Sequence, residues 1–224
     1  MSPLSFQQQR GATLISTLIG VVLSLLTIGS MMLLHRTMAV ASTQANQELA
    51  RDSQVQSSLQ NALTEIQQAG FGISPGEPGL NLWTSTDGKR VGWRYRASLA
   101  DSTFVCGGLW VVTSSQVARP QDNSTSEPGL FLFQGVPCTS ADDASLWRAT
   151  SPHRHQLASG RAFYETEGGE ALAYSLSRAV FVKGSASACA PFASAPSTAG
   201  THPRVSMLID GRTAFQSCLI NLLP

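Results

Sequence analysis

The sequence predicts an α+β protein in which a long N-terminal helix is followed by a head of antiparallel β-strands. Three observations lead to this prediction: an apolar run near the N-terminus, an amphipathic continuation of that run, and a series of glycine turns between alternating segments further along. The chain has 224 residues, which is enough for one ordinary domain plus an extension.

The apolar run covers residues 12–34 and contains no charged residue and no proline. As a helix it would be about 35 Å long, which is enough to cross a hydrocarbon core of about 30 Å. A secretory signal has a shorter apolar core followed by a small-residue cleavage site. A triplet ending at Ala41 fits such a site and leaves cleavage there as an alternative, although His35 and Arg36 separate it from the core. We therefore expect the run to anchor the chain in a membrane.

The helix is expected to continue beyond the membrane, because residues 37–68 contain neither proline nor glycine. Their apolar side chains recur every three or four positions, which places them on one face of a helix. The apolar positions are Met38, Ala41, Ala45, Leu49, Val55, Leu59, Ala62, Leu63 and Ile66. A single helix over residues 12–68 would be about 85 Å long and would end at the following glycines. The alternative is an anchor and a separate coiled-coil stalk, with a break near His35.

Four cysteines follow the apolar run, and none of them forms a C-x-x-C pair. An even number indicates an oxidising compartment and two disulfides, and it places the C-terminal part outside the cytoplasm. Three pairings are possible. Closure of the shorter loops favours Cys106–Cys138 and Cys189–Cys218, each of which would stabilise the fold by about 3 kcal/mol. Four buried free thiols are the alternative.

Residues 70–224 are expected to form the β-rich head. Glycine turns at Asp87-Gly88, Gly168-Gly169 and Asp210-Gly211 separate alternating runs and predict type I′ hairpins. Further strands are predicted at residues 104–112 and 130–133, and polar or low-complexity loops at residues 114–129 and 184–203. We expect the antiparallel sheet to pack on the amphipathic half of the helix.

The return strand of the second hairpin is predicted to run from residue 170 to residue 182. Its apolar side chains are then expected to share one face of the sheet. These are Leu172, Tyr174, Leu176, Val180 and Val182.

Catalytic signals are weak, and we predict neither enzymatic activity nor a cofactor. The net charge is +1 with 13% charged residues, which provides no basic patch for direct nucleic-acid binding. His153 and His155 form an H-x-H pair downstream of Asp142 and Asp143, but a solvated loop is the more common meaning of such a pair than a metal site. Three glutamates near a hairpin turn are interpreted as its solvated tip: Glu165, Glu167 and Glu170.

The start of the chain resembles the class III leader of type IV pilins and pseudopilins. The resemblance rests on Arg10-Gly11 followed by the apolar run "ATLISTLIG". It implies that a prepilin peptidase cuts between Gly11 and Ala12 and methylates the new amino terminus at Ala12. The segment "LQNALTEIQQAGFGI" over residues 59–73 is similar to the helix end of PilW-type minor pilins.

Two positions depart from the family pattern. Ala12 stands where the family usually has phenylalanine, and Ser16 stands where it usually has a glutamate that pairs with a neighbouring amino terminus. The Ser16 hydroxyl can instead bond to the carbonyl of Ala12 at low cost. A subunit with no neighbour ahead of it has no need of that carboxylate, which predicts a position at or near a filament tip. The alternative is that the glutamate is dispensable in a low-abundance subunit.

The resemblance divides the chain into a leader (residues 1–11), a transmembrane half-helix (12–36), an amphipathic half-helix (37–69) and a periplasmic or extracellular head (70–224). It implies a minor pilin that supports pilus assembly, with adhesion or DNA uptake as further roles. The implied partners are the prepilin peptidase, other minor and major pilins, the inner-membrane assembly platform and, before assembly, membrane lipid. The implied location is the bacterial inner membrane and then the cell-surface filament. The alternatives are a minor pseudopilin of a type II secretion system and a single-span periplasmic binding protein or enzyme.

Overall fold

The computed structural model describes residues 10–74, 80–113, 117–118, 125–126, 128–148, 151–160, 164–167, 170–173, 176–188 and 201–222. The chain divides into two compact units, Met1–Ala50 and Arg51–Pro224. The predicted turn Gly168-Gly169 lies outside the described residues.

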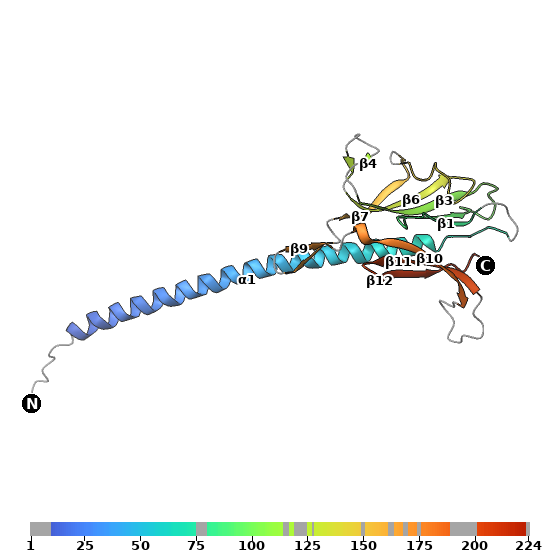
Figure 1. The fold of residues 1–224 in the computed structure, drawn as a ribbon. Coiled ribbons are helices and arrows are strands. Elements are labelled where there is room, and N and C mark those ends of the chain that lie inside the picture. Colours follow the sequence, from blue (N-terminus) through green and yellow to red (C-terminus); the bar gives the residue numbers. More distant parts are fainter. Residues whose placement is uncertain are drawn as a thin grey trace, which may run out of the picture. The chain divides into compact units, whose positions relative to one another are not determined.

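A single helix, α1 (Arg10–Ile66), forms the N-terminal part of the chain (Figure 1). It is continuous through His35, which confirms one 57-residue helix rather than an anchor and a separate stalk. In the part of the helix that belongs to the Met1–Ala50 unit, side-chain hydroxyls donate to backbone carbonyls three residues earlier at 2.8–2.9 Å. These hydroxyls therefore have hydrogen-bond partners within the helix. They belong to Thr17, Ser24, Thr27, Ser30, Thr37 and Thr43.

The helix ends at Ile66, two residues before the predicted end. The predicted glycines follow it, and both Gly70 (φ 80°) and Gly72 (φ 68°) have left-handed backbone. The Gly70 amide donates to the Arg94 carbonyl at 2.9 Å, and the Arg96 amide donates to the Phe71 carbonyl at 2.9 Å. These bonds join the end of α1 to the sheet that follows.

Five antiparallel strands form the first sheet, in the order β1-β2-β3-β6-β7. They are β1 (Leu82–Thr84), β2 (Arg90–Tyr95), β3 (Val105–Val112), β6 (Gly129–Pro137) and β7 (Arg154–Ser159). The strands predicted at residues 104–112 and 130–133 are confirmed as β3 and β6, although β6 continues to Pro137.

Three antiparallel strands form the second sheet: β10 (Val180–Ala188), β11 (Thr201–Ile209) and β12 (Arg212–Cys218). The loop predicted at residues 184–203 is therefore shorter, because both of its ends pair as strands, Ser187 with His202 and Ala188 with Thr201. Small residues with little strand propensity are held in the sheet here by backbone pairing, which composition alone does not reveal.

Two short hairpins complete the strands: β4 (Val117–Ala118) with β5 (Thr125–Ser126), and β8 (Tyr164–Glu167) with β9 (Glu170–Ala173). The first lies within the loop predicted at residues 114–129.

The predicted return strand over residues 170–182 is wrong, because the 3-10 helix η2 (Leu176–Arg178) separates β9 from β10. This turn lets Leu176 and Ala179, which are three residues apart, both enter the core. After the turn Phe181 is buried, while Val182 is 42% exposed. Leu176, Val180 and Val182 therefore do not share one face, and the side chains of Leu172 and Tyr174 lie outside the described residues.

The two described glycine turns differ in type. Asp210 (φ 53°) and Gly211 (φ 75°) connect Ile209 to its partner Arg212, which confirms the type I′ hairpin. The prediction is wrong at Asp87-Gly88, where only the glycine has a positive φ. The carboxylate of Asp87 accepts hydrogen bonds from the Ser85 hydroxyl and the Lys89 amide, and it thereby stabilises a wider turn.

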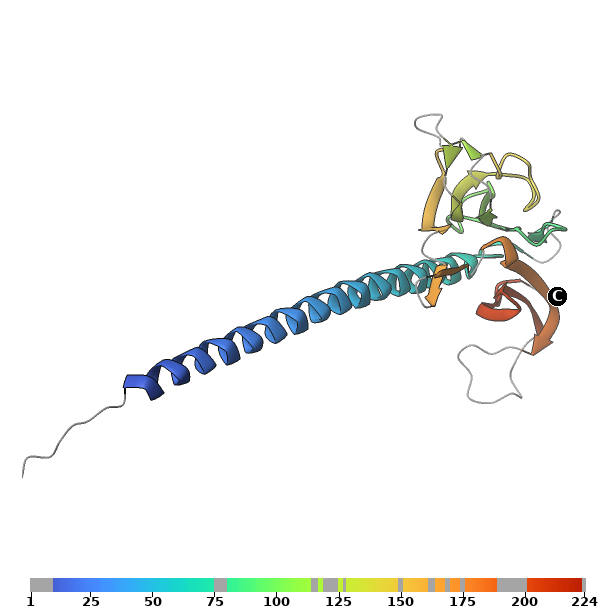
Figure 2. The same cartoon turned by 60° about the vertical axis from the view of Figure 1, so that its left-hand side comes forward.

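The core of the Arg51–Pro224 unit contains side chains from the last turns of α1 and from both sheets. Figure 2 shows the ribbons of these elements next to one another. From α1 it takes Ala62 and Ile66, with Val55, Leu59 and Leu63 partly buried against it. This confirms the predicted packing for the later half of the apolar stripe.

Both sheets supply most of the rest of this core. Leu82, Val91, Trp93, Leu109, Val111, Leu130, Leu132 and Ala158 come from the first sheet, and Phe181, Val205, Met207, Ile209 and Phe215 come from the second.

A smaller aromatic layer covers the opposite face of the five-stranded sheet. Phe133 and Trp147 meet edge to face with centroids 5.6 Å apart, and Trp110 stacks on Phe133 at 6.2 Å. Leu146 and Trp147, which lie outside the strands, close this layer. Both faces of the sheet are therefore covered, since alternate side chains of β3 and β6 point into different layers.

Candidate functional site

The first candidate site is the apolar surface of α1 within the Met1–Ala50 unit. By length and composition, this helix is apolar enough to cross a membrane. Every side chain from Leu14 to Leu34 is exposed. An apolar surface that surrounds a helix on all sides has no favourable state in water, which indicates burial in lipid or against other helices.

The sequence-predicted processing residues lie at the start of the same helix. Gly11 and Ala12 belong to α1, which begins at Arg10, and their side chains lie outside the described residues. Ser16 is exposed on α1. Its predicted bond to the Ala12 carbonyl stays a prediction, as does cleavage between Gly11 and Ala12.

The cysteines are oxidised. Cys106 on β3 and Cys138, just after β6, form a disulfide with Cα atoms 5.8 Å apart, which confirms this pairing. Cys218 is also disulfide-bonded, while Cys189 lies outside the described residues. Cys106 is fully buried in the aromatic layer, so this bridge holds the segment after β6 onto the sheet.

His153 and His155 do not form a metal-binding cluster with Asp142 and Asp143. In the described part of the chain, no three His, Cys, Asp or Glu side chains are arranged so that they could hold a metal ion. Asp143 serves a structural turn instead. Hydrogen bonds from the Ser145 amide (2.9 Å) and, further away, the Thr139 amide (3.4 Å) hold the pKa of its carboxyl below the ordinary value.

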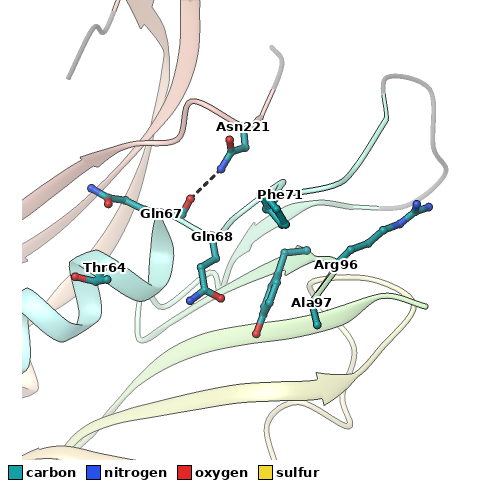
Figure 3. Close-up of a pocket in the computed structure, with 8 residues that line it drawn as sticks. Thr64, Gln67, Gln68, Phe71, Arg96, Ala97 and Asn221 are labelled. Carbon is teal, nitrogen blue, oxygen red and sulfur yellow. Dashed lines mark hydrogen bonds between the residues drawn. The ribbon is translucent and has the colours of Figure 1, made fainter. Parts of the chain in front are cut away.

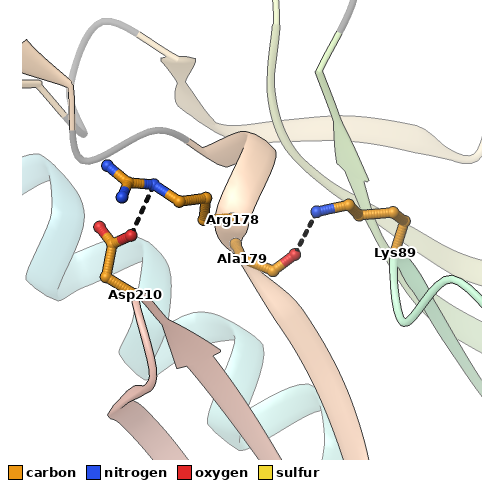
Figure 4. Close-up of polar contacts among 4 residues, drawn as sticks. All are labelled: Lys89, Arg178, Ala179 and Asp210. Atoms are coloured by element: carbon orange, nitrogen blue, oxygen red, sulfur yellow. Dashed lines mark hydrogen bonds and ion pairs between the residues drawn. The ribbon is translucent and has the colours of Figure 1, made fainter.

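Polar contacts join the two sheets on the side of η2 (Figure 4). The Lys89 ammonium donates to the Ala179 carbonyl at 2.6 Å, and Arg178 pairs with Asp210 at 2.6 Å. The Phe181 amide also donates to the Gly88 carbonyl at 2.6 Å. The contacts of Lys89 and Gly88 fix the β1–β2 turn to the start of β10, while the Arg178–Asp210 pair fixes η2 to the turn between β11 and β12.

A second candidate site is an open groove of about 460 Å³ at the C-terminal end of α1 (Figure 3). The end of the helix, its glycine cap, the end of β2 and the C-terminal segment all contribute to it. Its lining residues are Thr64, Gln67, Gln68, Phe71, Tyr95, Arg96, Ala97 and Asn221. We call this site the amide groove, because three of these side chains are amides.

Hydrogen bonds order the polar groups of the amide groove. The side-chain NH₂ group of Asn221 donates to the Gln67 backbone carbonyl at 3.0 Å, which ties the C-terminal segment to the helix end. Gln68 donates to the Glu65 carboxylate at 3.1 Å. Burial raises the pKa of Tyr95, and a hydrogen bond with the Gly135 backbone opposes part of that rise, so the phenol is neutral at physiological pH.

The groove was not predicted from the sequence, because "QQAGFG" indicated only a helix end. The two consecutive glutamines next to the glycine cap are the only local signal, and the contribution of Asn221 depends on chain reversal across the whole head.

Arg94 was also missed. It is 1% exposed, and its guanidinium donates to the Asn81 side chain (2.6 and 3.0 Å) and to the Thr139 carbonyl (2.9 Å) above the ring of Phe104. In β2 it follows Trp93 and precedes Tyr95, and an arginine that alternates with aromatic residues in a strand usually faces solvent.

Comparisons with protein-family models, with curated proteins and with solved structures give no match to this chain. The structure by itself defines the class: an α+β protein with one N-terminal helix long and apolar enough to span a membrane, antiparallel sheets of five and three strands, and a disulfide-bonded head.

Proposed function

We propose that this chain is a minor pilin-type subunit of a type IV filament. The observation that carries the proposal is the two-part character of one continuous helix. Its first part presents apolar side chains all around, and its last turns belong to the core of a β-rich head. Such a helix can reside in lipid and later pack against other helices, because both environments accept the same apolar surface.

The polar groups of the exposed segment support this exchange between environments. Residues 14–34 contain no ionisable side chain, and the hydroxyls of Ser24, Thr27 and Ser30 are bonded within the helix. Leaving the membrane therefore requires the transfer of no charged side chain from this segment.

The N-terminus of the protein isolated from its host tests the proposal. We expect cleavage between Gly11 and Ala12, with one added methyl group on Ala12, measured by intact mass and N-terminal peptide mass spectrometry. A mature chain beginning after Ala41 or an unprocessed Met1 would contradict the proposal and favour a secreted or single-span protein.

The proposal extends to a position at or near the filament tip. Ser16 provides no carboxylate to pair with the amino terminus of a subunit ahead of it. Immunogold labelling of a tagged protein on purified filaments is expected to mark one end only. Labelling along the whole length would rule out the tip position, while the filament assignment would stand.

A further inference from the structure

We propose that the amide groove is a binding site for a neutral carbohydrate. This inference does not depend on the filament assignment, because every residue of the groove belongs to the Arg51–Pro224 unit. It rests on the shape of the groove, its hydrogen-bonding groups, its exposed aromatic ring and its charge.

The groove is built by rigid elements. Gly70 and Gly72 turn the chain from α1 toward the sheet. Backbone hydrogen bonds join this turn to β2, and the side-chain NH₂ of Asn221 donates to the Gln67 carbonyl. A groove whose walls are tied by such contacts is formed before a ligand arrives, which lowers the cost of binding.

Side-chain amides dominate the polar surface of the groove. Gln68 uses its NH₂ group toward Glu65, which leaves its carbonyl oxygen as an acceptor, and Asn221 likewise keeps its side-chain oxygen after donating to Gln67. Gln67 also lines the groove, but its side-chain amide points away from Gln68 and Phe71 (Figure 3). The hydroxyls of a sugar can donate to the acceptor oxygens of Gln68 and Asn221.

Phe71 supplies the apolar counterpart. Its ring is 41% exposed and lies at the groove beside Gln68 (Figure 3). A flat ring next to hydrogen-bonding amides suits a ligand with one C–H face and polar edges, which describes a pyranose.

Charge argues against a strongly ionic ligand. Arg96 is the one charged residue among those that line the groove. Its guanidinium lies over the ring of Phe104, 5.0 Å from the centroid, and points away from Gln68 and Phe71 (Figure 3). The groove therefore offers an acidic sugar no close ion pair, and this favours a neutral sugar.

A peptide fits the groove less well. Peptides that bind by strand addition need an open sheet edge, whereas β2 pairs with β1 on one side and β3 on the other. A peptide held by its side chains needs an enclosed apolar pocket, which an open groove lined by amides does not provide.

The test uses the full chain in zwitterionic detergent micelles, because maltoside detergents would themselves present glucose. Lactose, cellobiose and N,N′-diacetylchitobiose are titrated by isothermal calorimetry and saturation-transfer NMR. We expect saturable binding of at least one disaccharide. Phe71→Ala and Gln68→Leu are each expected to weaken that binding about tenfold or more.

Leu80→Ala is the matched control, since Leu80 is 42% exposed and does not line the groove. It is expected to bind like the unaltered protein. Thermal unfolding of each variant separates loss of binding from loss of fold, and Gln68→Leu keeps the test valid should Phe71→Ala not fold.

Digalacturonate and an extended peptide are titrated in the same way. Four results would overturn the proposal: no binding of any of the three disaccharides, equal binding by Phe71→Ala and Leu80→Ala, binding of digalacturonate alone, or binding of the peptide in place of the sugars. None of these results bears on processing at Gly11, so the two proposals fail independently.

Discussion

Gly70 shows how a single residue determines the direction of the chain after the long helix. Its φ of 80° lies in the left-handed region, and an added Cβ would lie 2.6 Å from the Asn221 carbonyl oxygen. Gly135 has a similar φ of 63°, but nothing lies within 4 Å of the corresponding position. Alanine substitutions at these two glycines therefore distinguish the cost of backbone strain from the cost of steric overlap.

We expect Gly135→Ala to reduce the free energy of unfolding by about 1 kcal/mol, which is the cost of a left-handed alanine. Gly70→Ala should cost at least about 2 kcal/mol more, because the Asn221 backbone must also move. Urea denaturation of both variants measures the difference. Equal losses would show that the helix end has room for a side chain.

Asp143 makes stability depend on pH. Its pKa is lowered by hydrogen bonds from Ser145 and Thr139, so the folded protein favours the carboxylate more than the unfolded chain does. The stabilisation is therefore present above the ordinary value of 3.8 and is lost as the pH falls from there through the lower folded pKa.

Asp143→Asn should be less stable than the unaltered protein at neutral pH, and the gap should narrow below about pH 4. Denaturation midpoints measured across this range provide the test. Asp101→Asn removes an exposed carboxylate elsewhere and controls for the loss of one negative charge. A gap that stays constant with pH would contradict the role of Asp143.

At the scale of elements, α1 has the same kind of apolar residue in two different environments. Ile66 is fully buried in the core, while Leu49 is 65% exposed. The spacing along the helix does not distinguish them, because both belong to one stripe. Their burial depends on whether strands lie beside that turn of the helix.

Ile66→Ala is expected to lower the free energy of unfolding by about 2–5 kcal/mol, since it leaves a cavity against both sheets. Leu49→Ala should change it by no more than about 0.5 kcal/mol. Chemical denaturation monitored by tryptophan fluorescence of the head gives both values. Similar effects at the two positions would mean that α1 contributes nothing specific to the core.

The Cys106–Cys138 disulfide links β3 to the segment that covers the aromatic layer. It closes a loop with a sequence separation of 32. We expect the double variant Cys106→Ala/Cys138→Ala to lose about 3–4 kcal/mol of unfolding free energy. Near-ultraviolet circular dichroism should also change, because Trp147 would be less firmly held on Phe133. If the free energy of unfolding is unchanged, the aromatic contacts alone hold this segment on the sheet.

For the whole molecule, the division at Ala50 has a direct consequence. The Arg51–Pro224 unit contains its own core, which uses only the last turns of α1. A chain beginning at Arg51 is therefore expected to fold as a soluble, disulfide-bonded domain with cooperative unfolding. Secretion to the periplasm followed by thermal denaturation tests this. A chain that unfolds non-cooperatively would show that the head needs the first unit.

Local patterns in the sequence were sufficient for much of the fold. The absence of proline and glycine over residues 37–68 predicted a helix without a break, and that helix runs from Arg10 to Ile66. Asp210-Gly211 predicted a tight hairpin, since two consecutive positive φ values require such residues. Loop length favoured the Cys106–Cys138 pairing that the structure contains.

What the sequence alone determined is the element types, because helix period, glycine turns and apolar length depend on neighbours along the chain. The tertiary structure decided the separation into two sheets, the break at η2, the burial of Arg94 and the meeting of Gln68 with Asn221 around one groove. Each of these depends on contacts between residues far apart in sequence. Such contacts are selected by packing and by hydrogen-bond satisfaction across the whole head, and no short window of sequence contains that information.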